Sequence, residues 1–258
     1  MNFDFEIPRS QPDSDKSLVE GDIDTALNEH VPEWTSSDVR DIEMYGEQVS
    51  ELNESRGVEA LASYRSFRRG GSWGITINRT GIQGIAWILH SKTGLAPKVC
   101  IKTAYRVLYA HERFHFQVDC AYLSLELWMK HLDGNLDPMS DGSLYLRSRN
   151  RFSTYDPLEE ALANARAWRY LNKELMKPKR PTSNLHLLQH IEAFLLNSPT
   201  GYRDFEKFSG TEKFLAGLDS LMSPGVDLTR KPRAGGFKLL VDLDNSKING
   251  NYVPTYIQ

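Results

Sequence analysis

The chain has 258 residues, of which 40% are hydrophobic and 25% are charged, and its formal net charge is −3. These values are typical of a globular protein with room for one large or two small domains. The sequence has no run of eighteen apolar residues, and its first residues lack the basic and apolar regions of a signal peptide. We therefore expect a cytoplasmic protein without a membrane-spanning helix.

The charge is unevenly distributed along the chain. Residues 1–55 contain 15 acidic and 3 basic residues, whereas the remaining 203 residues carry a balance of +9. We treat residues 1–55 as an acidic N-terminal segment, partly disordered and then helical, and residues 56–258 as the main domain. The acidic segment is either a polar tail with a solvated helix or an arm that lies across a basic cleft and moderates access to it.

The acidic N-terminal segment is predicted to begin as a disordered stretch and to continue as a helix. Residues 1–18 contain prolines and scattered Ser and Asp, and we expect them to be disordered. Residues 35–37, Thr-Ser-Ser, are suited to cap a helix whose apolar positions between residues 39 and 52 keep helical spacing. The apolar positions between Val58 and Phe67 suggest a second helix.

Glycines and a proline divide the next region into a strand and two helices. Residues 73–78 form the best early strand candidate, and residues 82–89 predict a short helix that ends at Gly94. Pro97 is suited to open a long helix that continues to about residue 129. Cys100 and Cys120 would then lie about 30 Å apart, which excludes a disulfide and favours buried thiols.

The long helix contains the string His111-Glu112-Arg113-Phe114-His115. Helical geometry places side chains four positions apart on one face, so both imidazoles can reach one metal ion. Glu112 would then lie beside the open coordination position, where it could take a proton from a zinc-bound water. The string therefore predicts a hydrolytic zinc site.

The third ligand distinguishes the classes of zinc protein that share this string. A metzincin would continue with Gly at position 118 and His at position 121, but this chain has Val118 and Ala121. That class is therefore excluded. A gluzincin instead takes a Glu from a later helix, often with an acidic or amide residue one turn on.

A helix that fits this requirement is predicted to follow Asp156. Asp156 is suited to the N-cap, Pro157 to the first helical position, and Glu159 to the third, where its carboxylate can reach back to the cap. Glu160 is then left as the metal ligand, on the same face as Asn164, among small alanines that permit close helix packing. Glu160 is therefore favoured over Glu159 as the ligand, and a purely structural role of both at the helix start stays open.

The two motifs His111-Glu112-x-x-His115 and Glu160-x-x-x-Asn164 resemble those of gluzincin-type zincin metallopeptidases, including the minigluzincins and the ImmA/IrrE-type regulator peptidases. The resemblance covers about residues 70–175. It implies a mainly helical α+β zincin-like fold with a small sheet, in which His111, His115 and Glu160 bind one Zn²⁺ ion. It further implies that Glu112 is the general base and that Asn164 supports a ligand. The long separation of the motifs suggests an inserted stretch.

The group that stabilises the oxyanion is not fixed by these motifs. Residues 185–196 predict a further helix with His186 and His190 on one face. Since no Glu follows His186, a second metal site is not expected there. The candidates for the oxyanion-stabilising side chain are Tyr155, His190, Tyr145 and Arg113.

Two further strands are predicted near the end of the chain. Residues 237–243 and 252–257, separated by Asn249-Gly250, form a predicted β-hairpin in which Pro254 makes the last strand an edge strand. In zincins an extended peptide aligns with a sheet edge ahead of the metal-binding helix. Residues 73–78 are a candidate for that edge, with ordinary packing as the alternative.

The favoured function is zinc-dependent hydrolysis of a restricted peptide or protein substrate inside the cell, with Glu112 as general base. The alternative is a non-proteolytic zincin-fold module for metal sensing or protein binding. A weaker alternative is a basic-cleft nucleic-acid binder, suggested by the alternating Arg147, Arg149 and Arg151. No helix-turn-helix or RNA-binding signature supports it, and the pI of about 6.2 is not that of a nucleic-acid binder. Neither a membrane partner nor an oligomeric state is indicated.

Overall fold

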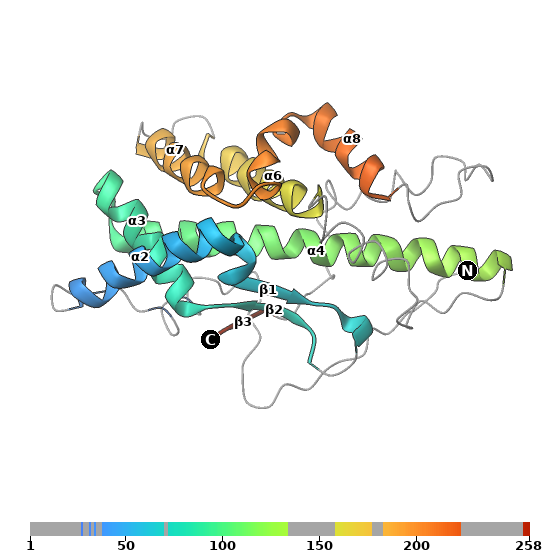
Figure 1. Cartoon of the computed structure of the whole chain (residues 1–258), viewed down its shortest axis with the longest axis horizontal. Helices are drawn as coiled ribbons and strands as arrows, with labels where there is room; N and C mark the ends of the chain where they lie inside the picture. The colour runs from blue at the N-terminus through green and yellow to red at the C-terminus, as the bar shows by residue number, and fades with distance from the viewer. Residues whose placement is uncertain are drawn as a thin grey trace.

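The computed structural model describes Leu27, Val31 and Trp34 and residues 38–69, 72–133, 158–176, 183–222 and 255–258, with side chains left out for residues 128–133. The described chain is mainly helical and has one small sheet (Figure 1). This arrangement confirms the predicted α+β class.

The described helices follow one another along most of the chain. The α-helices are α2 (Val39–Arg56), α3 (Arg79–Thr93), α4 (Pro97–Asp133), α6 (Leu158–Leu175), α7 (Ser183–Leu196) and α8 (Thr211–Met222). Three short 3₁₀ helices accompany them, namely η1 (Val58–Ala60), η2 (Phe67–Arg69) and η3 (Tyr202–Phe208). The predicted helices at residues 82–89, 97–129 and 185–196 are thus confirmed as α3, α4 and α7.

The sheet has the strand order β1-β2-β3, with β1 at Ala62–Arg65, β2 at Gly74–Ile77 and β3 at Thr255–Ile257. Strand β1 runs antiparallel to β2, and β3 runs parallel to β2. The strand predicted at residues 73–78 is confirmed as β2. However, β2 lies between the other two strands, so the expectation that it forms a free edge for a peptide is wrong.

The helix predicted between Val58 and Phe67 is also wrong, because this segment folds as η1, β1 and η2. Ala62 and Tyr64 are buried while Ser63 and Arg65 are exposed, which is the two-residue alternation of a half-buried strand. Backbone pairing with β2 stabilises this strand and outweighs the helical spacing of the apolar residues.

Helix α3 ends and helix α4 begins at the predicted residues. Gly94 has φ +66°, in the left-handed region, and its N–H donates to the carbonyl of His90 at the end of α3. Pro97 opens α4. At the start of α2 the N-cap is Asp38, which makes no side-chain capping hydrogen bond, and the predicted cap at residues 35–37 lies outside the described residues.

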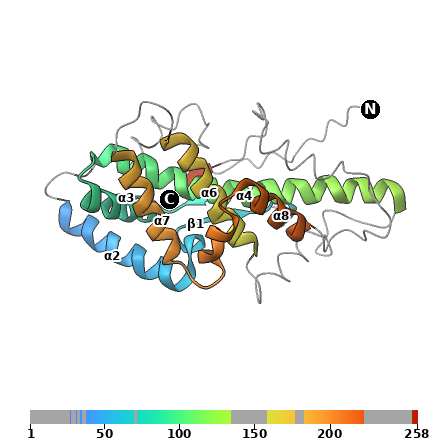
Figure 2. The same cartoon turned by 90° about the horizontal axis from the view of Figure 1, so that it is seen from above.

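Helix α4 forms the centre of the molecule. The sheet lies on one side of it and α6, α7 and α8 lie on the other, while α2 packs against α3 at one end (Figures 1 and 2). The contact between α2 and α3 is close, since a Cβ atom on Gly84 would lie 2.5 Å from the carbonyl oxygen of Tyr45. The metal-ligand candidates on α4 therefore lie within the molecule and not on its surface.

Several expectations concern residues outside the described part. These are the disorder of residues 1–18, the inserted stretch and the alternating arginines between residues 134 and 157, and the first strand of the C-terminal hairpin. Among the described strands, β3 lies at an end of the sheet, which agrees with the edge strand predicted at residues 252–257. Cys100 and Cys120 are free thiols, as predicted, but only Cys100 is buried and Cys120 is half-buried. None of the described helices combines the length and apolar character needed to cross a membrane.

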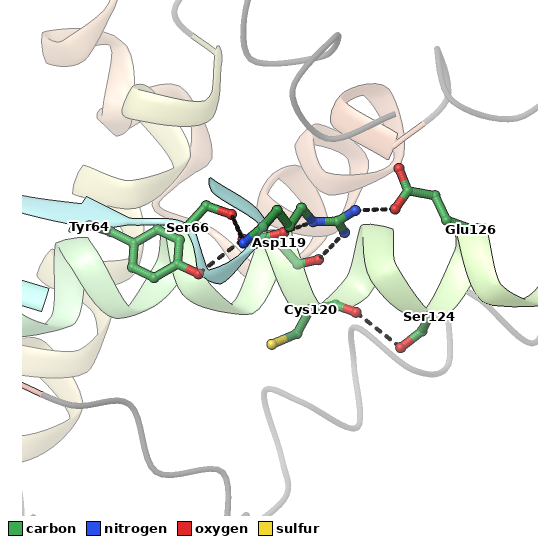
Figure 3. Close-up of polar contacts among 7 residues, drawn as sticks. Tyr64, Ser66, Asp119, Cys120, Ser124 and Glu126 are labelled. Atoms are coloured by element: carbon green, nitrogen blue, oxygen red, sulfur yellow. Dashed lines mark hydrogen bonds and ion pairs between the residues drawn. The ribbon is translucent and has the colours of Figure 1, made fainter. Parts of the chain in front are cut away.

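A buried charge cluster joins the β1–η2 segment to α4 (Figure 3). The Asp119 carboxylate on α4 accepts hydrogen bonds from Ser66 Oγ at 2.6 Å and from Tyr64 Oη at 2.9 Å. The Arg68 guanidinium pairs with both Asp119 and Glu126, and its Nη2 donates to the carbonyl of Asp119 at 2.9 Å. These three charged side chains are fully buried. They fix the sheet against the helix.

We predict that Arg68→Met lowers the free energy of unfolding by about 3–5 kcal/mol, because it leaves two buried carboxylates without their guanidinium partner. Urea denaturation followed by circular dichroism measures this loss.

Lys207→Met is the matched control. Lys207 pairs with Asp204 on the surface, so its loss should change the free energy of unfolding by less than about 1 kcal/mol. Equal effects of the two substitutions would show that the buried cluster contributes no more than an exposed pair.

Candidate metal centre

Helix α4 brings two imidazoles together in the interior. His111 and His115 lie one turn apart and are fully buried. Their ring centroids are 5.0 Å apart, and their Nε2 atoms are 3.3 Å apart. The helix alone accounts for this proximity, as the four-residue spacing predicts.

Helix α6 supplies a carboxylate at the same point. Glu160 Oε2 lies 3.2 Å from Nε2 of His111 and 3.4 Å from Nε2 of His115. The ligand atoms of these three residues all lie within 4.8 Å of one another, which makes them a group that could hold a metal ion. Within the described residues this is the only such group of His, Cys, Asp or Glu.

The opposite nitrogens of both rings are also bound by α6. Asn164 Oδ1 lies 2.8 Å from Nδ1 of His111, and Glu159 Oε1 lies 2.7 Å from Nδ1 of His115. An acceptor at Nδ1 favours the tautomer that carries its proton there, which leaves the Nε2 lone pair directed toward Glu160. Asn164 and Glu159 therefore orient the two rings for a cation.

This geometry separates the roles of the two adjacent glutamates. Glu160 approaches the Nε2 atoms, whereas Glu159 binds the far side of the His115 ring. The sequence predicts a capping role for Glu159 at the helix start and gives no sign of its contact with His115. A helix with Glu at two successive positions directs the carboxylates about 100° apart, which lets one approach the cation and the other a ligand.

Charges at the centre favour a bound cation or proton. Burial lowers the pKa of His115, but the carboxylates of Glu160 and Glu159 outweigh it and hold that pKa well above its ordinary value. Burial conversely raises the pKa of Glu160, but His115 and His111 outweigh it and hold that pKa well below its ordinary value. In the absence of a metal, these shifts favour a proton on His115, paired with the Glu160 carboxylate.

Glu112 lies next to this group and is fully buried. Burial raises its pKa to about 7, against the opposing effect of His111 and His115, and with smaller raising contributions from Glu160 and Glu59. Among the described residues, neither carboxylate oxygen of Glu112 has a hydrogen-bond partner. Since buried polar groups are almost always paired, these two oxygens fit a site that receives a cation with water or substrate.

Close packing of α6 against α4 makes the centre possible. The buried face of α6 contains small residues beside the ligand, namely Ala161, Ala163, Ala165 and Ala167. They let the helix backbones approach, so that the short Glu160 side chain reaches both imidazoles. This close packing agrees with the prediction from the small residues around Glu160.

Two residues near the centre were not foreseen. Tyr202, on η3, accepts a hydrogen bond from Asn164 Nδ2 at its carbonyl oxygen, over 3.1 Å. Its hydroxyl donates to Glu59 Oε2 over 3.3 Å. Both residues come from short 3₁₀ helices far from the two motifs in sequence, and no local pattern points to them.

Of the four candidates for oxyanion stabilisation, the structure describes His190 and Arg113. Tyr155 and Tyr145 lie outside the described residues. His190 lies on α7, and within the described part of the chain it makes no hydrogen bond or ion pair with the metal-ligand candidates. The guanidinium of Arg113 lies over the ring of Tyr109, 5.9 Å from its centroid.

Comparisons of the chain with models of known protein families, with curated proteins and with solved structures found no match.

We predict that purified protein binds one divalent cation per chain and that His115→Ala or Glu160→Ala abolishes this binding at micromolar metal. Glu159→Gln should retain the ion with about 10–100-fold lower affinity, because it only orients a ligand. Elemental analysis and chelator competition measure both effects.

His186→Ala removes an exposed histidine and serves as control, with unchanged metal content expected. If Glu159→Gln lost the ion while Glu160→Ala kept it, the assignment of the two glutamates would be reversed.

Metal affinity should also depend on pH. His115 is protonated up to its raised pKa, and its imidazolium must lose that proton before Nε2 can bind a cation. In a titration from pH 6 to pH 8, the apparent affinity for added Zn²⁺ should therefore rise with pH, by at most about tenfold per pH unit for the one released proton, and fall again on acidification. Competition with a chromophoric chelator across this pH range measures the apparent Zn²⁺ affinity. An affinity that does not change with pH would contradict the release of a proton from His115 on metal binding.

Proposed function

We propose that this chain is a zinc-dependent peptidase that hydrolyses a restricted peptide or protein substrate. The observation that carries the proposal is the buried Glu112, with two unpartnered oxygens, beside two oriented imidazoles and the Glu160 carboxylate. Two His and one Glu form a donor set used by catalytic zinc, which keeps a fourth position open for water or substrate. The motif resemblance to gluzincins agrees with this donor set.

The metal ion and Glu112 would have different roles in the reaction. When bound, zinc lowers the pKa of a water molecule and polarises a carbonyl group. Glu112 takes the proton from the attacking water at its carboxylate and transfers it to the leaving amine nitrogen. A cation beside Glu112 would favour its charged form, so the carboxylate is available as a base at neutral pH.

The substrate backbone has a suitable position along β1. This strand contacts α4 and, among the strands that the structure describes, is the end strand of the sheet on the side opposite β3. An extended peptide can add to such an edge by backbone hydrogen bonds. Tyr64 and Ser66 bind Asp119, one turn beyond His115, and hold this edge beside the centre. We propose that the substrate aligns with β1 and not with β2.

One observation favours a second candidate function. The side chains of His111, Glu112 and His115 are all fully buried, and that of Glu160 is only 11% exposed. Such a closed centre also suits a metal-sensing or protein-binding module that performs no proteolysis. The two functions differ in whether the metal-loaded protein turns over a peptide.

We predict that Glu112→Gln reduces peptide cleavage by about 10²–10⁴-fold, because the amide cannot take up the proton, while zinc stays bound. The assay uses zinc-loaded protein with denatured casein and a mixture of short peptides, and mass spectrometry identifies new termini.

Glu212→Gln changes an exposed glutamate in the same way and should leave cleavage unchanged. If the wild-type protein bound zinc and cleaved none of these substrates, the non-proteolytic function would be favoured. Retained cleavage by Glu112→Gln would remove Glu112 from the mechanism.

A further inference from the structure

Helix α8 packs closely along one face of α6 (Figure 1). A Cβ atom on Gly217 of α8 would lie 2.7 Å from Cδ2 of Leu162, and Nη2 of Arg169 donates to Oγ1 of Thr211 at 3.4 Å. These two contacts define the face of α6 that is turned toward α8. Since helical geometry places positions 162, 166 and 169 within an arc of about 60°, Arg166 lies on this face as well.

The guanidinium of Arg169 is held in place by two contacts with α8. Its Cζ atom lies 4.7 Å from the centroid of the Phe214 ring, which is buried, and Thr211 accepts the hydrogen bond from Nη2. The ring attracts the flat face of the cation, while the hydroxyl binds one of its edges. The guanidinium is therefore oriented before any ligand binds.

The other edge of this guanidinium lacks a partner among the described residues. Nη1 of Arg169 is buried and makes no hydrogen bond there. Burial lowers the pKa of Arg169, and no carboxylate in the described part of the chain opposes that shift. Arg68 shows the opposite case, since Asp119 and Glu126 outweigh burial and raise its pKa. Because buried donors and cations are almost always paired, Arg169 is suited to an anion supplied by a ligand.

Arg166 adds a second positive charge on the same face of α6. Burial, together with Arg113 and Arg169, lowers its pKa to about 10, against the opposing effect of Tyr170, so it is still charged at neutral pH. Arg166 and Arg169 are half-buried and Thr211 is exposed, so a small ion can approach the two guanidinium groups from solvent. Two neighbouring cations repel each other, and an anion between them would reverse this effect.

We propose that Arg169 and Arg166 bind a phosphate group at the interface between α6 and α8. A phosphate dianion balances two guanidinium groups, whereas a carboxylate balances only one, and the planar guanidinium fork matches phosphate oxygens. The Thr211 hydroxyl accepts a hydrogen bond from Arg169 and can donate its own proton to the same ligand. This site uses no residue of the metal centre, so it does not depend on the proposed peptidase function.

Isothermal titration calorimetry with inorganic phosphate tests this site directly. The full chain is used without unbound metal, at a fixed ionic strength set by sodium chloride. We expect saturable binding of phosphate that is at least about tenfold tighter than that of acetate, which carries one charge. Phosphoserine and adenosine 5′-monophosphate are titrated in the same way. Tighter binding of one of them than of the free ion identifies the source of the phosphate group.

Arg169→Gln should weaken phosphate binding by at least about tenfold, because it removes the oriented cation. Arg169→Lys keeps a charge but loses the planar fork, and it should weaken binding by a smaller factor. Arg203→Gln is the matched control, since the exposed Arg203 also donates Nη2 to a threonine hydroxyl, that of Thr200, at 3.1 Å. This control should bind phosphate as the wild type does. Circular dichroism shows that each variant is folded.

A titration in the presence of EDTA separates this site from the metal centre, where phosphate could bind a metal ion. Phosphate affinity should not change with EDTA, and a loss of binding would place the anion at the metal centre and overturn the proposal. The absence of saturable phosphate binding, or equal binding of phosphate and acetate, would also overturn it. So would an unchanged phosphate affinity in folded Arg169→Gln or, if that variant does not fold, in Arg169→Lys.

Discussion

The metal centre depends on one packing contact, that of α6 against α4. A helix can place two imidazoles one turn apart, but the carboxylate must come from another element. Because α6 has buried alanines around Glu160, its backbone lies close enough for Oε2 to approach both Nε2 atoms within 3.4 Å. The same helix binds both Nδ1 atoms through Glu159 and Asn164. A small shift of α6 would therefore alter the ligand and both orienting contacts together.

The second constraint is the number of ionisable groups that the interior contains. Helix α4 has His111, His115 and Asp119 at successive turns, and all three are buried. The histidines face carboxylates of α6, while Asp119 faces Arg68 and the β1 segment. Each group is stabilised by a partner from another layer, which makes the layers interdependent. Such buried charges are costly when unpaired, so the pairs specify how the sheet and α6 dock on the central helix.

The sequence predicted those elements whose signals are local. Gly94 and Pro97 mark the end of α3 and the start of α4, and the apolar run near residue 75 identified β2. The prediction was wrong at β1. The apolar residues in and around this four-residue strand also have a spacing that is compatible with a helix. The parallel pairing of β2 with β3 could not be predicted either, since it joins Ile75 to Thr255 across most of the chain. Such pairing depends on how the whole chain packs.

For the site, the sequence by itself determined the two imidazoles and the adjacent Glu112, because the helical repeat fixes their relative positions without any other part of the chain. It also narrowed the third candidate ligand to two neighbouring glutamates. Only the tertiary structure decided which of them approaches the Nε2 atoms and gave the other a role at His115. The positions of Glu59 and Tyr202 likewise arise from packing between distant segments, which no local spacing encodes.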